Sequence, residues 1–159
     1  MARKGPTKPR EIAPDPIYGS KLLSKLINRS MRDGKKSVVQ REIYLAFKII
    51  KEKSGDDPVK VFAEALENIK PNMEVRARRV GGAAYQVPIS VRVQRRESLG
   101  IRWLIASANS RPSSEFKNYG EKLAAEIMDA AKGEGTAVKK RQDVERVAEA
   151  NRAFAHFRW

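Results

Sequence analysis

The sequence contains no cysteine and only one histidine, His156. Without cysteine the chain can form no disulfide, no thiolate zinc site and no cysteine nucleophile. A single histidine near the end of the chain cannot by itself supply a histidine-based metal site or a nucleophile with its base. Few groups therefore remain for metal-dependent or covalent chemistry, and we expect neither a cofactor nor a metal.

Long apolar runs are also missing. No stretch approaches the roughly 20 apolar residues that a membrane-spanning helix needs, and the start of the sequence lacks the hydrophobic segment of a signal peptide. We therefore expect a soluble protein that is not exported and has no membrane partner.

Acidic residues are few compared with basic ones. The 159 residues include 33 Lys and Arg but only 19 Asp and Glu, which gives a formal net charge of +14. Such a surplus repels itself unless an anionic partner neutralises it, and a polyphosphate is the partner that fits best. An anionic membrane surface could attract the same charge, but no apolar segment accompanies it.

Enzymatic motifs are weak. The run from Asp33 to Ser37 contains the Gly-Lys pair of a phosphate-binding loop, but Arg29 stands where that motif needs its first glycine. A helix end followed by two solvated lysines explains the run better, although those lysines can still contact RNA phosphate. Most carboxylates lie near Lys or Arg at helical spacing, as Glu67 does with Lys70. We expect no enzyme, and a metal-dependent nuclease is the alternative.

The spacing of apolar residues predicts a mostly α fold with basic extensions at both ends. Residues 1–15 contain three prolines and no acid before Glu11, which indicates an extended basic arm. Residues 16–159 are expected to form a single helical domain of about six helices with one protruding β-hairpin. The predicted helices cover residues 20–31, 39–54, 58–69, 99–108, 113–131 and about 137–155.

The hairpin is predicted at about residues 73–93, where apolar and charged residues alternate with a period of two. Gly81 and Gly82 lie between its two strands, in a loop that we expect to be longer than two residues. Pro88 lacks a backbone N–H, so the second strand should be exposed along at least one edge.

Arginine is concentrated in and beside this hairpin. Residues 73–96 hold six arginines against one acid, Glu74. The planar guanidinium suits bidentate contact with phosphate and stacking on exposed bases, although a solvated strand face is the alternative. Tyr85 near the hairpin tip could stack on a base or pack on its own hairpin.

Two further aromatic groups have structural interpretations. Trp103 has helical spacing to Leu99 and Leu104, and we expect it in the core. Residues 151–159 form an aromatic and basic tail that either docks on the body or meets a partner; it contains Arg152, Phe154, Phe157, Arg158 and Trp159.

The chain resembles the family of bacterial small-subunit ribosomal protein seven over almost its whole length. The resemblance rests on several separated motifs: Met31-Arg32-Asp33-Gly34-Lys35-Lys36, Lys70-Pro71, Met73-Glu74-Val75-Arg76, Arg78-Arg79-Val80-Gly81-Gly82-Ala83, Tyr85-Gln86-Val87-Pro88, Arg102-Trp103-Leu104, Asp143-Val144-Glu145-Arg146 and the run from Ala148 to His156. It implies a helical fold with a protruding hairpin and a structural role in the small ribosomal subunit of a bacterial or plastid-type ribosome in the cytoplasm.

The resemblance also implies a target. Members of the family are primary binders of the 3′ major domain of small-subunit (16S-type) ribosomal RNA and nucleate assembly of the subunit's head. They grip RNA with the basic arm, the loop after the first helix, and the hairpin with its flanking helix. In this chain those segments point to Arg3, Lys4, Lys8, Arg10, Lys35, Lys36, Arg76, Arg78, Arg79, Arg92, Arg95 and Arg96.

Further partners follow from the same resemblance. The hairpin tip, with Gly81, Gly82 and Tyr85, is expected near the exit-site transfer RNA and the messenger path. Small-subunit ribosomal proteins nine and eleven are expected neighbours, and no homo-oligomer is expected. The leading rival is a free RNA-binding or annealing protein of similar fold.

Overall fold

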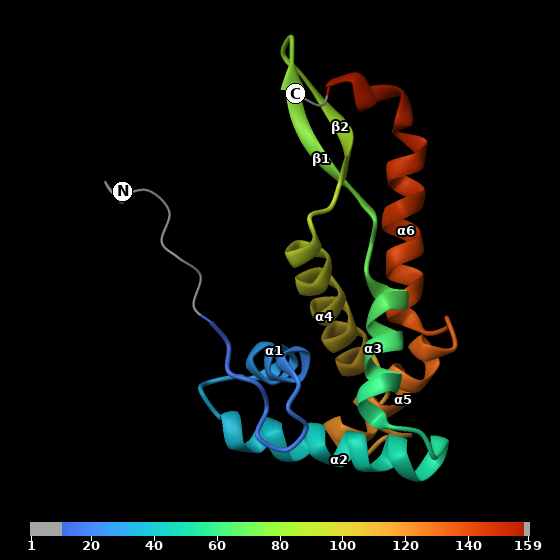
Figure 1. Ribbon diagram of the computed structural model, residues 1–159. Coiled ribbons are helices and arrows are strands. Elements are labelled where there is room, and N and C mark those ends of the chain that lie inside the picture. Colours follow the sequence, from blue (N-terminus) through green and yellow to red (C-terminus); the bar gives the residue numbers. More distant parts are fainter. Residues whose placement is uncertain (1–10, 158–159) are drawn as a thin grey trace.

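The computed structural model describes residues 11–157 (Figure 1). Four basic residues of the predicted arm, Arg3, Lys4, Lys8 and Arg10, lie outside this range, as do Arg158 and Trp159. The described part is one mostly helical domain with one antiparallel hairpin, as predicted. In chain order its elements are α1 Lys21–Ser30, α2 Lys36–Ser54, α3 Pro58–Ile69, β1 Met73–Val80, β2 Ala83–Ser90, α4 Val93–Ser110, α5 Tyr119–Ala131, α6 Thr136–Ala150 and the short 3₁₀ helix η1 Arg152–Phe157.

The start of α1, the end of α2 and the start of α3 lie at the signals expected from the sequence. Two other boundaries differ: α1 ends at Ser30 and α2 begins at Lys36, so Gly34 lies between the helices and is not the helix end that was expected. The Ser20 hydroxyl accepts a hydrogen bond from the Leu23 amide at the start of α1. Asp57 accepts one from the Val59 amide, at 3.0 Å, and is followed by Pro58 in the first turn of α3. Gly55 ends α2 in the left-handed conformation, with φ 76°.

The core lies among α1 to α5 and the start of α6, in the lower half of Figure 1. Phe47 of α2 and Phe62 of α3 pack together at its centre, with Leu104 of α4 and Ile127 of α5 also fully buried. Gly100 lets α4 approach α3 closely, because a Cβ there would lie 2.9 Å from the Leu66 side chain. The glycine that weakened the sequence pattern of this helix is therefore a packing residue.

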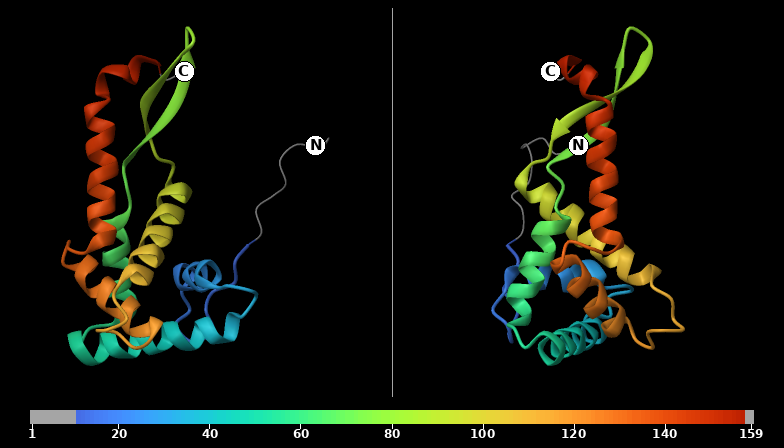
Figure 2. Two further views of the ribbon diagram at one scale, coloured as in Figure 1. Left: turned by 180° about the vertical axis from the view of Figure 1, so that it is seen from behind. Right: turned by 90° about the vertical axis from the view of Figure 1, so that its right-hand side faces the viewer.

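The hairpin and α6 project from this core. Figures 1 and 2 show α6 running beside β1 and β2, with η1 turning back over the hairpin near its tip. Helix α6 itself ends at Ala150, where the Asn151 side chain donates to the Val147 carbonyl. No helix among residues 11–157 is both long and apolar enough to cross a membrane.

The hairpin turn is tighter than the sequence predicts. Val80 pairs directly with Ala83, so Gly81 and Gly82 alone form the turn. Both have positive φ, 58° and 93°, which is the backbone that a two-residue hairpin turn requires and that glycine adopts without strain. The expectation of a longer loop is therefore wrong. With two strands in the sheet, Pro88 lies in an edge strand, as expected.

The second strand also ends earlier than predicted. It stops at Ser90. Val93 is already the first residue of α4, and 71% of the surface of Val93 is exposed. Val91 is buried and its amide donates to the Asn72 carbonyl, so the apolar pattern continues beyond the strand. Arg95 and Arg96 consequently lie on a helix.

Helix α5 begins at Tyr119, not at Ser113 as predicted. The Gly120 amide donates to the carboxylate of Glu42 on α2, and the Lys122 ammonium binds the Arg111 carbonyl. These contacts fix the start of α5 against another helix and hold the preceding segment in a non-helical path. Phe116, expected on the helix, lies in that segment with the Arg111 guanidinium 5.6 Å from its ring centre.

Trp103 is only partly buried. Leu104 beside it is fully buried, but Trp103 packs on the edge of the core and lines a hollow between β1, α4 and α6 with Val75 and Val144. The prediction that it is a core residue is wrong, because its helical spacing does not distinguish the centre of a buried face from its margin.

Candidate nucleic-acid interface

The root of the hairpin brings a strand and a helix together around one carboxylate. Glu74 on β1 has 7% of its surface exposed. Its Oε1 accepts from Arg76 Nε at 3.0 Å and from Arg95 Nε at 2.9 Å, and its Oε2 accepts from Arg95 Nε at 2.8 Å. Two predicted site residues from different elements thus share one buried acid.

Arg96 joins the same region through other groups. Its Nε donates to the Pro71 carbonyl at 3.1 Å and its Nη2 to Asn72 Oδ1 at 2.7 Å. The backbone N–H of Asn72 in turn donates to the carboxylate of Glu145 on α6. The start of α4, the root of β1 and the middle of α6 are therefore linked by polar contacts.

The remaining predicted arginines lie on the same strand and helix start, with Arg79 on the opposite face of β1 from Arg76 and Arg78. Arg78 and Arg79 lie further along β1 towards the tip, and Arg92 is the cap residue of α4. Arg79 is exposed and donates to the Gly82 carbonyl of the turn. The structure thus places all six arginines of the region on the hairpin or the first turn of α4, which we call the hairpin–α4 surface.

Two helix starts lack a side-chain acceptor for their first amides. Neither α2 nor α4 has a side-chain cap or an acid in its first turn. The other four α-helices receive a side-chain oxygen at their first amides, from Ser20, Asp57, Glu42 and Glu126. Among the described residues, the two helices without a side-chain cap, α2 and α4, begin at the predicted basic loop after α1 and just after the basic hairpin. The N-terminus of a helix favours anions such as phosphate.

Lys35 and Lys36 lie at the start of α2, at the opposite end of the molecule from the hairpin (Figure 1). Both are exposed. The structure does not bring them together with the hairpin arginines, so the predicted residues form two separate basic sites.

A trough between α1 and α4 lies between these two sites. It consists of two adjoining hollows of about 620 and 530 Å³ that share Arg29. Lys21, Lys25 and Arg29 line it from α1. Sequence reasoning missed these three residues, although their spacing of four places them on one helical face. The trough is also lined by Arg32 and Lys35 and by the acids Glu11, Asp33, Glu42 and Glu97, so five basic side chains lie with four acidic ones and its charge is nearly balanced.

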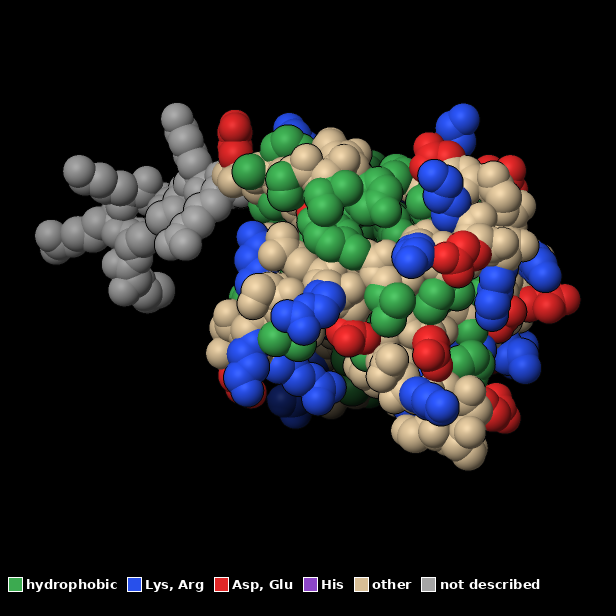
Figure 3. All heavy atoms as spheres, turned by 90° about the horizontal axis from the view of Figure 1, so that it is seen from below, with side chains coloured by type: hydrophobic (Ala, Val, Ile, Leu, Met, Phe, Trp, Pro, Cys, Tyr) green, Lys and Arg blue, Asp and Glu red, His purple; other side chains and the backbone are tan. Residues whose placement is uncertain are grey.

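The face seen from below carries no comparable surplus of positive charge. In Figure 3, acidic and basic side chains are interspersed over much of the face seen from below. The ion pair between Lys48 and Glu52 of α2 is one such pairing of opposite charges. The basic surplus of the described residues therefore lies mainly in two segments: residues 73–96, with six arginines and one acid, and residues 21–36, with six basic residues and one acid.

Tyr85 packs against the end of the chain. Its ring lies 5.2 Å from the ring centres of both Phe154 and Phe157, which stack on each other at 6.5 Å. The tail was expected either to dock on the body of the protein or to meet a partner. Its described part, residues 151–157, docks on the hairpin. The Tyr85 ring packs on η1, which is a contact that neither alternative for this residue included.

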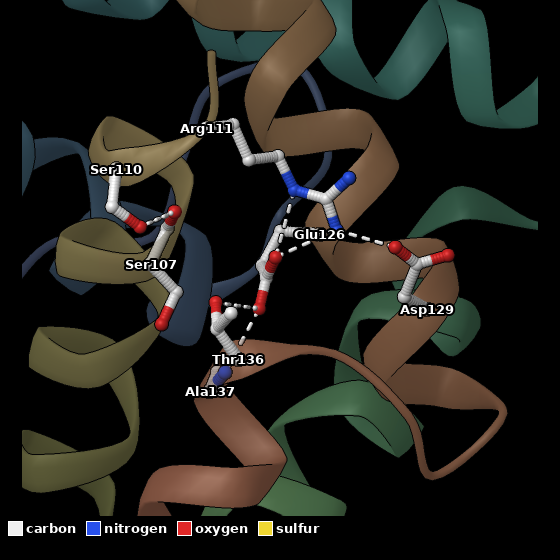
Figure 4. Close-up of polar contacts among 7 residues, drawn as sticks. All are labelled: Ser107, Ser110, Arg111, Glu126, Asp129, Thr136 and Ala137. Atoms are coloured by element: carbon white, nitrogen blue, oxygen red, sulfur yellow. Dashed lines mark hydrogen bonds and ion pairs between the residues drawn. The ribbon is translucent and has the colours of Figure 1, made fainter.

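A buried acidic group elsewhere is structural. Glu126 of α5 is fully buried, and its Oε2 accepts from Arg111 Nε at 2.8 Å while its Oε1 accepts from the Ala137 amide at 2.9 Å (Figure 4). Arg111 also pairs with Asp129. Burial alone lowers the pKa of the Arg111 guanidinium, but its hydrogen bonds to Asp129 and Glu126 outweigh this and raise the pKa. The network joins the end of α4 to the start of α6.

No group of three or more acidic or histidine side chains suited to a metal occurs within residues 11–157.

Comparison with known proteins agrees with the geometry. Residues 2–152 match the family described as Ribosomal protein S7p/S5e. The chain is 58% identical to a protein of Carboxydothermus hydrogenoformans, 60% to one of Caldicellulosiruptor bescii and 59% to one of Thermoanaerobacter pseudethanolicus, each over 100% of both chains. All three bear the name small ribosomal subunit protein uS7.

The chain belongs to the S7p/S5e family of ribosomal proteins. The resemblance noted in the sequence is thereby confirmed. Membership makes the chain a structural ribosomal protein and not an enzyme, which removes the nuclease alternative. These relatives are bacterial small-subunit proteins, which agrees with the expected place in a cytoplasmic ribosome of bacterial type.

Proposed function

We propose that this chain is a structural component of the small ribosomal subunit that binds the 3′ major domain of its ribosomal RNA and nucleates assembly of the head. The observation that carries the proposal is the hairpin–α4 surface, where six arginines meet one acid beside an uncapped helix start. Arginine forks bind phosphate in pairs of hydrogen bonds, and the free amides of α4 add donors without adding side chains.

The proposed interface extends from the hairpin–α4 surface along the α1–α4 trough to the loop before α2. The near-balanced trough suits shape-dependent contact, and the two basic ends suit phosphate contact. Residues 1–15 are proposed to extend this interface as a basic arm, with Arg3, Lys4, Lys8 and Arg10 as phosphate ligands. Residues 16–159 would then form the single RNA-binding domain.

The hairpin tip is proposed to lie near the exit-site transfer RNA and the messenger path. Gly81 and Gly82 are exposed at the end of the projection, where a narrow tip can approach another molecule closely. Because the Tyr85 ring packs on η1, we propose that it supports the shape of the tip and does not stack freely on a base. Small-subunit proteins nine and eleven are proposed neighbours, and the mostly exposed, polar α6 leaves surface for them.

A binding experiment tests the proposal. The purified full chain is titrated against a transcript of the 3′ major domain and against a transcript of equal length from another domain of the same RNA. We expect a dissociation constant at least about 1,000-fold lower for the first, the low end of typical specific recognition. Equal affinities for the two transcripts would contradict the proposal.

The rival function of a free RNA-annealing protein is tested in cells. The endogenous protein should sediment with small subunits in low-magnesium gradients. If it remains at the top of the gradient while other small-subunit proteins sediment, the ribosomal role is excluded in favour of the rival.

A further inference from the structure

The hairpin–α4 surface contains one acid, and that acid is buried. Glu74 lowers the local positive charge by one, so by itself it opposes attraction to RNA. It also holds Arg76 and Arg95 through four short contacts. We propose that Glu74 is a positioning residue that sets these two arginines in the orientation needed to recognise ribosomal RNA. This inference rests on the proposed RNA-binding function and deepens it.

The geometry leaves the arginines available. The Arg76 side chain is 56% exposed and that of Arg95 48%, whereas the Glu74 side chain is 10% exposed. Arg95 uses only its Nε towards Glu74, and no other described residue accepts from its two terminal nitrogens. Arg76 uses Nε and Nη2. Each guanidinium is thus held by its inner edge and presents its outer N–H groups to solvent.

The proposed role concerns the relative position of two elements, β1 and α4. Arg76 comes from β1 and Arg95 from the first turn of α4, and the shared carboxylate fixes the spacing between their guanidinium groups. A long arginine side chain loses rotamer freedom when it binds phosphate. If a protein carboxylate has already restricted the two side chains, less freedom is lost when RNA binds, and only RNA with phosphates at the matching spacing benefits.

A purely structural ion pair would look similar in the free protein, so the test must measure recognition. Glu74→Gln raises the net charge by one. Its matched control is Glu64→Gln, on the exposed face of α3, which makes the same charge change away from the hairpin–α4 surface. Both full-length variants are titrated against the 3′ major domain transcript and the equal-length transcript from another domain, and circular dichroism and thermal melting check their folding.

A positioning role for Glu74 and a purely structural ion pair predict different results. If Glu74 positions the arginines, Glu74→Gln binds the 3′ major domain about tenfold more weakly, because two side chains are no longer preorganised, while its binding to the other transcript does not weaken. Glu64→Gln should bind both transcripts as the unchanged protein does, or slightly more tightly. A Glu74→Gln variant that behaves like Glu64→Gln overturns the proposal.

A second pair of variants keeps the test valid if Glu74→Gln fails to fold. Arg95→Lys retains the positive charge but removes the Nε that Glu74 binds. Arg92→Lys makes the same change at an exposed residue of the same turn for which no described carboxylate is a partner. We expect a several-fold loss of affinity for the 3′ major domain with Arg95→Lys beyond that with Arg92→Lys. Equal affinities for these two variants would also overturn the proposal.

Coupling between the residues gives the most specific readout. In a double-mutant cycle, Arg95→Ala should weaken specific binding less in the Glu74→Gln background than in the unchanged protein, and additive effects would contradict positioning. The outcomes also separate the two proposals. If the unchanged protein does not prefer the 3′ major domain, the proposed function fails. If it does and the variants show no coupling, only the role of Glu74 fails.

Discussion

At the scale of single residues, buried acids hold parts of the backbone that the sequence pattern leaves undefined. Asp15 is the last residue of the predicted arm, yet it is 3% exposed. Its Oδ2 accepts from the amides of Ile17 and Tyr18, and its Oδ1 accepts from the Tyr44 hydroxyl at 2.8 Å. This carboxylate ties the segment before α1 to α2, and no local periodicity could have indicated it.

Tyr44→Phe tests this tie. Burial, followed by the hydrogen bond to Asp15, raises the pKa of Tyr44 from 10.0 to about 12. The resulting stabilisation is fully present below pH 10 and is lost as the pH rises through about 12, because only the protonated phenol can donate. We expect Tyr44→Phe to lower the free energy of unfolding at pH 7 by about 1 kcal/mol, and to lose less stability than the unchanged protein between pH 10 and 12. Urea titrations across this range give the comparison, and parallel pH profiles would contradict the role of this hydrogen bond.

Glu126→Ala tests the network of Figure 4. It leaves the half-buried Arg111 and the Ala137 amide without their shared acceptor, and removing one partner of a buried ion pair costs about 3–5 kcal/mol. Chemical denaturation should show a loss of this size. Glu134→Ala, at an exposed residue of the adjoining loop, is the control and should change little. Equal denaturation midpoints for the two variants would show that Glu126 does not stabilise the junction of α4, α5 and α6.

At the scale of elements, local signals identify the regular helices and long-range contacts decide the exceptions. Ser20, Asp57 and Gly55 act where their residue types predict, since caps depend on the adjacent backbone. The start of α5 depends on Glu42, which is 78 residues from Gly120, and a pattern confined to residues 113–131 contains no information about it. Likewise, Gly81 and Gly82 indicate a turn, but the pairing of Val80 with Ala83 decides its length.

The candidate site was predictable in composition but not in arrangement. The arginines of the hairpin–α4 surface are evident from the sequence. That Arg76 and Arg95 share Glu74 requires the strand and the helix to meet, and the end of β2 at Ser90 was not predictable from the apolar pattern through Val91 and Val93. The spacing of Lys21, Lys25 and Arg29 predicts that they share one face of a helix. The trough that they line also requires α4 to lie beside α1, which their spacing does not predict.

The hairpin also depends on the end of the chain. Phe154→Ala removes one of the two η1 rings that pack on Tyr85. We expect faster hydrogen exchange of the backbone amides near the hairpin tip, while exchange in α2 and α3 stays unchanged, because an isolated two-stranded hairpin is only marginally stable. Arg152→Ala, which removes an exposed ion pair with Glu149, is the control. Unchanged exchange at the tip in Phe154→Ala would mean that the aromatic contact does not hold the hairpin.

At the scale of the whole molecule, the distribution of charge is more informative than its total. A net charge of +14 indicates only an anionic partner. Its concentration in residues 73–96 and 21–36 indicates which parts of the molecule are suited to such a partner. Family membership agrees with this arrangement.

Salt dependence tests this distribution. Replacing Arg76, Arg78 and Arg79 together with alanine should weaken binding to the 3′ major domain. It should also flatten the slope of log affinity against log salt concentration by up to about 0.7 to 0.9 for each phosphate that the variant no longer neutralises. Replacing Lys48, Lys51 and Lys53 of α2 with alanine lowers the charge by the same three units outside the hairpin–α4 surface and should change the slope less. Equal slopes for the two triple variants would show that the hairpin arginines do not reach phosphate.

Hydroxyl-radical footprinting of the full chain on complete small-subunit ribosomal RNA tests the central claim most directly, because it reports where the protein lies without presupposing a target. The account predicts protections confined to the 3′ major domain, with a contiguous subset lost when Arg76, Arg78 and Arg79 are replaced with alanine. Protections in another domain, or a footprint that the triple replacement leaves unchanged, would contradict it.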